Sequence, residues 1–390
     1  MSKKLNANFV LPVLMSFFVM SFIDLVGTGV DELKQSSETP GYILQLIPFV
    51  AFIWFFFLSV PVGIWQDKIG KRKALNIGIL ITAIGLLVPL LGNTLPVILT
   101  AFSLLGIGNT ILQVSANPLL VDVVPSDKSS SFLSFAQFMK SIGSMIGPYV
   151  AAVIGPKLAI LFGVETGEWR FGLYLFAIIS IIAFIWLSSV KIEETKAESE
   201  RASLSSCMKL LGNRFVLMMV FGIFLVVGID VAMNSNIGTF LTQKLGINEE
   251  TAKYGKSMYF FAKMIGTFAG ALLLTKIKAR SFLIASSAFA IVSLLALTVT
   301  PNEFSAWLII ALVSLGVSNI FPLIFSISVG KLPERANEIS GLMMMAICGG
   351  AIIPFLVGIV MENWLPGGIL VLVAGAIYLF GVGLASPKTK

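Results

Sequence analysis

Apolar stretches long enough to cross a lipid bilayer recur along this chain, and they limit what it can fold into. Of its 390 residues, 57% are hydrophobic and only 12% are charged, whereas soluble globular proteins have about 25% charged residues. With so few charged residues, the chain lacks the polar side chains needed to cover the surface of a water-soluble protein of this size. The uncovered surface must face lipid, and the chain is predicted to be an integral membrane protein.

A helix needs about 20 apolar residues to cross the hydrocarbon core, and the stretches are sufficient for twelve such helices. The predicted fold class is therefore an all-α membrane protein with two pseudo-symmetric bundles of six helices. The twelve spans are expected at 8–30, 41–65, 73–93, 96–122, 132–155, 169–190, 214–242, 254–277, 280–300, 304–330, 337–361 and 364–386.

The basic residues indicate how the spans are oriented. Of the 27 Lys and Arg residues, nineteen fall on one side of the predicted membrane and six on the other. Because cytoplasmic loops are enriched in Lys and Arg, both termini are expected to be cytoplasmic. The same bias explains the net charge of +7 without a nucleic-acid partner.

A long polar segment, 191–213, separates the spans into two groups of six. We expect an N-terminal bundle at 1–190, this segment as a cytoplasmic linker, and a C-terminal bundle at 214–390. The halves resemble each other, because Asp24 in VMSFIDLVGTG and Asp230 in LVVGIDVAMNS occupy matching places. Two related halves of this kind are typical of transporters, which bind substrate between them near the membrane midplane.

Several kinds of chemistry are absent from the sequence. The chain has no histidine, and Cys207 and Cys348 are not in a metal-ligand spacing. No paired nucleophile and base, metal cluster or phosphate-binding loop appears. We therefore expect no enzyme activity, no cofactor and no metal site.

The loop after the second span carries the most specific local motif, GIWQDKIGKRK, from Gly63 to Lys73. Its spacing matches the G-x-x-x-D-[RK]-x-G-[RK]-[RK] loop of the major facilitator superfamily, which the chain thus resembles. Gly63 permits close helix contact, and Asp67 can cap or pair with a neighbouring helix end. Gly70, Lys71 and Arg72 complete the predicted conformational loop.

Within that superfamily, the chain resembles the fucose–proton symporter family of bacterial sugar transporters. Three stretches carry the resemblance: LQVSANPLLVDVVP at 112–125, SFAQFMKSIGSMIGP at 134–148 and SNIFPLIFSISVGKL at 318–332. The resemblance implies uptake of a monosaccharide (hexose, deoxyhexose or amino sugar) by alternating access, in symport with a cation. It also implies a monomer in the bacterial inner membrane.

The chain departs from the family at several of these positions. The family symporter has a glutamate implicated in proton coupling where this chain has Gln113, which cannot ionise. An asparagine that follows the family's glutamine is Lys140 here, after Gln137. The family's first-span aspartate matches Asp31, whereas Asp24 has no acidic counterpart.

Charged residues inside the spans are candidates for ion coupling. A charge in a span costs about 2.5–3.5 kcal/mol on insertion scales, so it normally faces a cavity or a partner. We expect Lys140 to lie near Asp24 or Asp31, and Asp230 to pair with Lys263. Each pair either only neutralises charge and holds helices together, or is a switch in which a cation or sugar hydroxyls compete for the carboxylate. The residues do not distinguish a proton from sodium as the coupling ion, and the resemblance to the symporter family favours a proton.

Amides at membrane depth are candidates for binding sugar hydroxyls, since sugars are held by fixed amide and carboxylate groups. The same side chains can instead bond between helices, and this structural role is expected above all for Asn319. Alternatives to coupled uptake are an uncoupled sugar facilitator and an exporter of drugs or metabolites. The predicted substrate-binding residues are Gln113, Asn117, Gln137, Lys140, Asn234, Asn236 and Asn319.

Overall fold

The computed structural model of the protein describes residues 7–36, 43, 46–125, 128–164, 169–192, 194, 204–252 and 254–387. Within these residues every regular element is a helix. The chain forms two compact units. The first holds Met1–Ser126 with Ile142–Leu204, and the second holds Asp127–Ser141 with Ser205–Lys390.

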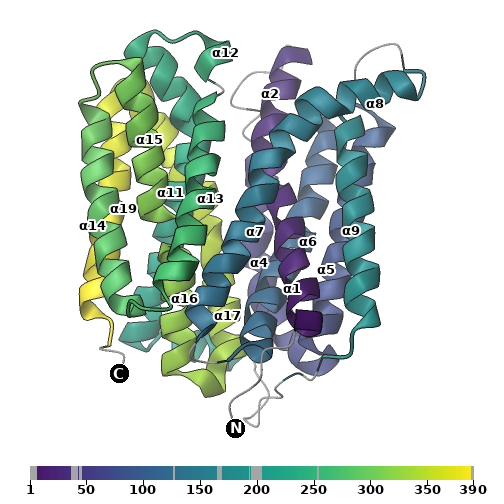
Figure 1. The fold of residues 1–390 in the computed structure, drawn as a ribbon, viewed down its shortest axis with the longest axis vertical. Coiled ribbons are helices and arrows are strands. Elements are labelled where there is room, and N and C mark those ends of the chain that lie inside the picture. The colour runs from purple at the N-terminus through teal and green to yellow at the C-terminus, as the bar shows by residue number, and fades with distance from the viewer. Residues whose placement is uncertain are drawn as a thin grey trace. The chain divides into compact units, whose positions relative to one another are not determined.

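The first unit contains the helices before the linker. In it, α5 packs against both α6 and α9, and Figure 1 shows these three helices side by side. Helix α7 contributes its first part to the second unit and its remainder to the first. The elements of this part of the chain are α1 (Ala7–Met20), the 3-10 turn η1 (Ser21–Leu25), α2 (Val26–Ser36), α4 (Leu46–Ile69), α5 (Lys71–Leu87), η2 (Val88–Leu91), α6 (Leu95–Val123), α7 (Ser129–Tyr149), the π-helical turn η4 (Val150–Ile154), α8 (Gly155–Leu161) and α9 (Phe171–Ser189).

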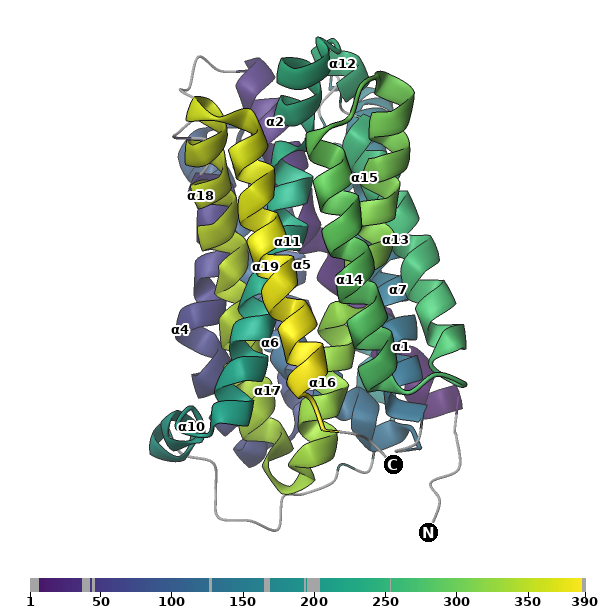
Figure 2. The same ribbon diagram turned by 90° about the vertical axis from the view of Figure 1, so that its left-hand side faces the viewer.

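The second unit contains the remaining helices. Here α14 packs against α19 and α15, and Figure 2 shows the pairing of α14 with α19. Its elements are α10 (Leu204–Leu210), α11 (Arg214–Leu245), α12 (Glu249–Ala252), α13 (Tyr254–Leu273), α14 (Ala279–Thr298), α15 (Glu303–Val317), α16 (Ile320–Lys331), η5 (Pro333–Arg335), α17 (Ala336–Met345), η6 (Ala346–Cys348), α18 (Gly349–Asn363) and α19 (Leu365–Ala385).

The predicted spans correspond to helices of this structure. Among the described residues, ten helical segments are long and apolar enough to cross a membrane. Two more, α7 and α13, are less apolar, and they carry Lys140 and Lys263 respectively. Together they make the twelve spans of the predicted fold class, with boundaries that differ from the predicted ones by a few residues. Residues 41, 42, 44 and 45 of the second predicted span lie outside the described residues.

Polar residues and glycines set the ends of several helices. The Asn213 side chain accepts a hydrogen bond from Phe215 N–H and caps α11, which ends at Gly246 with φ of 66°. Gly70 precedes α5 with φ of 95°. Positive φ is readily adopted only by glycine, so the glycines at these two positions account for the helix ends there.

The first span is not one regular helix. The 3-10 turn Ser21–Leu25 separates α1 from α2, although Ala7–Val30 as a whole is apolar enough to cross the membrane. Breaks of this kind occur where a side chain inserts into the backbone hydrogen-bond ladder. Asp24 lies within this turn.

Candidate functional site

The carboxylate of Asp24 meets a hydroxyl donor inside the first unit. Ser144 on α7 donates a hydrogen bond from its Oγ to Asp24 Oδ2 over 2.5 Å. The two segments approach closely, because a Cβ at Gly143 would lie 2.0 Å from Ser21 Oγ. A residue without a side chain is therefore required at 143. The result is a half-buried carboxylate held against α7 within an apolar span.

Three amides form a ladder along one face of α6, four residues apart. Asn117 donates from Nδ2 to the backbone carbonyl of Gln113 over 2.8 Å. Gln113 in turn donates from Nε2 to Asn109 Oδ1 over 2.7 Å. Asn109 donates from Nδ2 to the carbonyl of Met20, the last residue of α1, over 2.6 Å. All three amides are buried, so the ladder links α6 to the break in the first span.

Gln137 and Lys140 are half-buried on α7. The carbonyl of Gln137 accepts a hydrogen bond from Ser141 Oγ over 2.8 Å, within the same helix. Lys140 lies one helical turn before Ser144, on the same face of α7. Lys140 belongs to the second unit and Asp24 to the first, and the side chain of Asp31 on α2 lies outside the described part of the chain. The predicted pairing of Lys140 with either aspartate therefore stays a prediction.

The second predicted pair is present in the structure. Lys263 on α13 donates from Nζ to Asp230 Oδ2 on α11 over 2.5 Å. Tyr259, one turn before Lys263 and fully buried, donates from its hydroxyl to Asp230 Oδ1 over 2.8 Å. Ser314 on α15 donates to the backbone carbonyl of Tyr259 over 2.6 Å, so three helices of the second unit meet at this cluster. Each oxygen of Asp230 accepts one donor.

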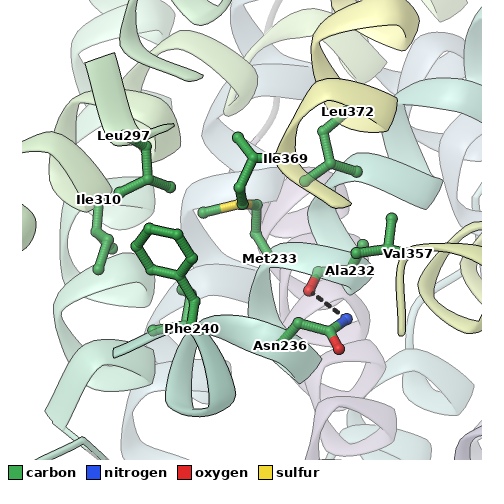
Figure 3. Close-up of a pocket in the computed structure, with 10 residues that line it drawn as sticks. Ala232, Met233, Asn236, Phe240, Leu297, Ile310, Val357, Ile369 and Leu372 are labelled. Atoms are coloured by element: carbon green, nitrogen blue, oxygen red, sulfur yellow. Dashed lines mark hydrogen bonds between the residues drawn. The ribbon is translucent and has the colours of Figure 1, made fainter. Parts of the chain in front are cut away.

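Asn234 and Asn236 are half-buried on α11. Asn236 lines a small apolar pocket between α11, α14, α15, α18 and α19. Figure 3 shows its amide turned back to its own helix, where Nδ2 donates to the carbonyl of Ala232 over 3.0 Å. Side chains such as Met233 and Phe240 make up the rest of the lining. Among the residues that line this pocket, Asn236 alone has a polar side chain, so a sugar would find few hydrogen-bond partners there.

Asn319 caps the break between α15 and α16. It is buried, and its Nδ2 donates to the carbonyl of Gly266 on α13 over 2.8 Å and to Ser318 Oγ over 3.0 Å. These contacts join neighbouring helices of one unit. They favour the structural interpretation that the sequence suggested for this residue.

The predicted conformational loop forms a charged cluster at one end of the first unit. Glu194 accepts hydrogen bonds from the backbone N–H groups of Lys71 and Arg72, over 2.6 and 3.0 Å. A carboxylate in this position satisfies unpaired donors at the start of α5 and complements its helix dipole. Lys71 is buried and donates from Nζ to Asp122 Oδ2 over 2.6 Å. A Cβ at Gly70 would lie 3.1 Å from both Glu194 carboxylate oxygens.

The remaining residues of the loop motif have different surroundings. Arg72 donates from its guanidinium to the carbonyls of Ser188 and Val190 at the end of α9. Gly63 is buried in α4, and Asp67 is exposed near the end of that helix. The loop therefore links the ends of α5, α6 and α9 with the first residues of the linker.

A second charged cluster lies at the start of α17 in the second unit. Arg335 donates to both oxygens of Glu338, over 2.5 and 2.9 Å. The hydrogen-bonded carboxylate raises the pKa of the Arg335 guanidinium above its ordinary value. Ser206 on α10 also donates to Glu338, over 2.5 Å. The end of the linker is thereby attached to this unit.

No group of three His, Cys, Asp or Glu side chains that could hold a metal ion occurs in the described ranges of the chain. Cys207 and Cys348 are both buried free cysteines. The polar groups that gather inside the spans are instead hydroxyls, amides, single carboxylates and lysines. Such groups are suited to binding polar solutes and cations.

Residues of these clusters that were not predicted from the sequence include Asn109, Ser144, Tyr259 and Glu194. For two of them a signal exists, since Asn109 precedes Gln113 by four residues and Tyr259 precedes Lys263 by four. Residues at this spacing share a helix face. Ser144 and Glu194 bond to residues 120 and 123 positions away, and no local pattern specifies those partners.

Twelve spans in two units, with carboxylates and amides inside the spans, define a multi-pass membrane protein with polar groups at membrane depth. The model of the Major Facilitator Superfamily matches residues 12–354. The chain belongs to this superfamily of membrane transporters, in agreement with the expectation that it is not an enzyme.

The similarity to known transporters extends over nearly the whole chain. A glucose/galactose transporter of Brucella abortus (strain 9-941) is 28% identical over 373 residues, which cover 92% of this chain and 89% of that one. A putative glucose/galactose transporter of Helicobacter pylori (strain 26695) is 25% identical over 358 residues, covering 89% and 87%. The crystal structure of the transporter FucP in its outward conformation superposes with a TM-score of 0.81 at 18% identity, covering 98% of this chain and all of that one. That likeness shows the shared fold.

Proposed function

We propose that this protein takes up a monosaccharide across the bacterial inner membrane, in symport with a cation, by opening alternately to the two sides. The observation that carries the proposal is the end-to-end similarity to two proteins named as glucose/galactose transporters. FucP, whose fold this chain shares, is a fucose:proton symporter and so also transports a monosaccharide. We further propose that the working form is a monomer with both termini in the cytoplasm.

The polar side chains within the spans are the proposed sugar ligands. Amide and ammonium groups bind hydroxyls without titrating in the physiological range, so they suit a neutral sugar. Asn319 is the weakest candidate, because its amide already joins α16 to α13. The proposed ligands are Gln113, Asn117, Gln137, Lys140, Asn234 and Asn236.

Carboxylates within the spans are the proposed sites of ion coupling. Asp24 and Asp230 each accept a hydrogen bond from a hydroxyl, and a carboxyl group in such a setting can take up a proton as its surroundings change. Asp31 and Lys140 complete the proposed set. We favour a proton over sodium as the coupling ion.

An uncoupled sugar facilitator is the second candidate function, and Gln113 is the observation that favours it. The glutamine cannot ionise, and its Nε2 is bonded to Asn109. A facilitator would move the sugar only down its gradient. The bundles 1–190 and 214–390, joined by 191–213, are the proposed moving parts in either case.

Transport in proteoliposomes tests the proposal directly. Purified protein is reconstituted, and uptake of radiolabelled hexoses, deoxyhexoses and N-acetylhexosamines is measured with a pH gradient, a sodium gradient or neither. Accumulation of one sugar above equilibrium under one gradient supports symport and identifies the ion. Equilibration without accumulation supports the facilitator.

A panel in which no sugar enters faster than into protein-free vesicles would contradict both functions. A matched variant shows that the reconstitution itself is sound. Ile182 on α9 is 54% exposed within an apolar helix, so Ile182→Ala is expected to transport like the native protein.

A further inference from the structure

The amide ladder on α6 ends on one particular backbone atom, the carbonyl of Met20. This carbonyl closes α1 immediately before the 3-10 turn that carries Asp24. Asn109, which is 1% exposed, reaches it over 2.6 Å. Where a helix changes its hydrogen-bond spacing, an inserted side-chain donor is one of the identifiable causes of the break.

That carbonyl fixes the direction of the two hydrogen bonds that the Asn109 side chain makes. A carbonyl oxygen only accepts, so Asn109 must present its Nδ2 to Met20. Its Oδ1 then faces Gln113 and also only accepts. Position 113 must therefore supply a donor, and the Nε2 of Gln113 does so over 2.7 Å.

This requirement distinguishes side chains that are otherwise similar in shape. Glutamine always has a donor, a methionine of similar length never has one, and a glutamate has one only while protonated. An ionised carboxylate at 113 would place a charge against Asn109 Oδ1 inside a buried cluster, which is strongly unfavourable. The same argument applies to an aspartate at 109 facing the Met20 carbonyl.

We propose that Asn109 and Gln113 are positioning residues for Asp24, and that the chain needs a hydrogen-bond donor at position 113. They hold the carbonyl that precedes the 3-10 turn, and the turn presents the Asp24 carboxylate to Ser144. Asn109 acts through the backbone of the first span. The role in transport rests on the proposed function, whereas the need for a donor does not.

The elements that pack against α6 carry few charged groups near the ladder. On η1 the group is Asp24. At the ends of α4 and α5 the groups are Asp67, Lys68, Lys71, Arg72 and Lys73. Of these, Lys71 bonds to Asp122 of α6, which lies nine residues beyond Gln113, about 13 Å along a helix that rises 1.5 Å per residue. Side chains of the charged residues of α2 lie outside the described part of the chain.

The test compares Gln113→Glu, Gln113→Met and Asn109→Asp across pH. Apparent melting temperature in detergent and sugar counterflow, with equal pH on both sides, are measured from pH 5 to 8.5. The carboxyl of Gln113→Glu can donate only while it is protonated. Stability from this bond is therefore present at low pH and lost as the carboxyl ionises with rising pH.

Gln113→Glu and Asn109→Asp are expected to lose counterflow at least about tenfold between pH 5 and 8.5, the factor that one pKa unit of difference supplies. Gln113→Met is expected to be impaired at every pH. The matched control is Asn76→Asp on α5, where the amide donates to Ser188 Oγ over 3.1 Å. A hydroxyl can reverse and donate to a carboxylate, so this variant should follow the native pH profile.

Equal melting temperature and counterflow of Gln113→Glu at pH 5 and 8.5 would overturn the proposal, as would a native-like Gln113→Met. If no sugar is transported by the native protein, the melting profile still decides the donor requirement. An acid-stabilised Gln113→Glu in that case supports the ladder and rejects the sugar assignment.

Discussion

Asp24 and Asp230 occupy matching places in the two halves of the sequence, yet the structure surrounds them differently. Asp24 lies in a 3-10 turn between two α-helices, whereas Asp230 lies within α11, an unbroken helix of 32 residues. A hydroxyl donates to each carboxylate, from Ser144 in the first unit and from Tyr259 in the second. Asp230 also accepts from the ammonium of Lys263 in its own unit.

The difference separates two roles that a charged residue in a membrane can have. A 3-10 turn can return to α-helical hydrogen bonding by a small change of backbone angles, so the setting of Asp24 can change shape. The ion pair of Asp230 sits on regular helices and neutralises a charge that lipid would not tolerate. We therefore expect changes at Asp24 to alter coupling and changes around Asp230 to alter stability first.

The largest effect is expected from Lys263→Met, which removes the ammonium beside Asp230. Taking away one partner of a buried ion pair costs about 3–5 kcal/mol. The side chains of Lys263 and Asp230 are 14% and 26% exposed, which favours the lower end of that range. The measurement is the apparent melting temperature and yield of monodisperse protein in detergent.

Restoring neutrality tests the cause of this loss. The double variant Lys263→Met with Asp230→Asn is expected to recover most of the stability. Lys276→Met, which removes a charge from an exposed position after α13, serves as the control. A double variant no more stable than Lys263→Met alone would show that charge balance is not the cause.

Asp24→Asn and Asp31→Asn are expected to abolish gradient-driven accumulation while counterflow is retained in large part. An amide keeps the size of the side chain but cannot take up a proton, and exchange of sugar for sugar does not need net ion movement. Accumulation and counterflow are compared in the same proteoliposomes. Normal accumulation in both variants would rule out the carboxylate switch in the first span.

Ser144→Ala is expected to weaken coupling by a smaller amount. Hydrogen bonds to charged groups contribute about 1.5–3 kcal/mol, and 1.4 kcal/mol corresponds to about tenfold in an apparent affinity. The measurement is the ion concentration that gives half-maximal accumulation. Ser141→Ala is the matched control, because that hydroxyl bonds only within α7, to the carbonyl of Gln137. Similar effects in both variants would assign the loss to α7 itself.

Tyr259→Phe is expected to have the smallest effect, because Lys263 still donates to Asp230. Hydrogen bonds to charged groups contribute about 1.5–3 kcal/mol, and the remaining ion pair places this loss at the lower end, visible as a small drop in melting temperature with transport preserved. A loss as severe as that of Lys263→Met would reverse the assignment and make the hydroxyl the main support of Asp230.

The fold followed from the sequence because one physical requirement dominates it. Every backbone polar group in lipid must be satisfied within its own segment, so apolar length alone predicts helices and their approximate ends. The 3-10 turn at Ser21–Leu25 escaped this reasoning, because Ala7–Val30 as a whole is apolar enough to cross the membrane as one helix. The donor that meets the carbonyl before the turn comes from Asn109 on another helix, and no hydropathy pattern contains such a contact.

Ion pairs were the part of the site that the sequence could predict, because a charge inside a span needs a partner of opposite charge. A lone Asp230 in a span implies a nearby cation, and Lys263 supplies it. Hydroxyl and amide partners could not be predicted in this way, because such side chains are common in membrane helices and can bond to many different groups. The pairing of Ser144 with Asp24 and of Asn319 with Gly266 depends on which helices pack together, and packing is not encoded at any single position.

The carboxylate of Glu194 has a consequence for the order of events during synthesis. This carboxylate accepts hydrogen bonds from the backbone N–H groups of Lys71 and Arg72, and Glu194 lies 123 residues after Lys71 in the chain. Translation at 5–20 residues per second takes roughly 6 to 25 s to make that length of chain. Throughout this interval the backbone N–H groups at the N-terminus of α5 must donate their hydrogen bonds to water or to another group. The first bundle is completed only when the ribosome has already begun the linker to the second.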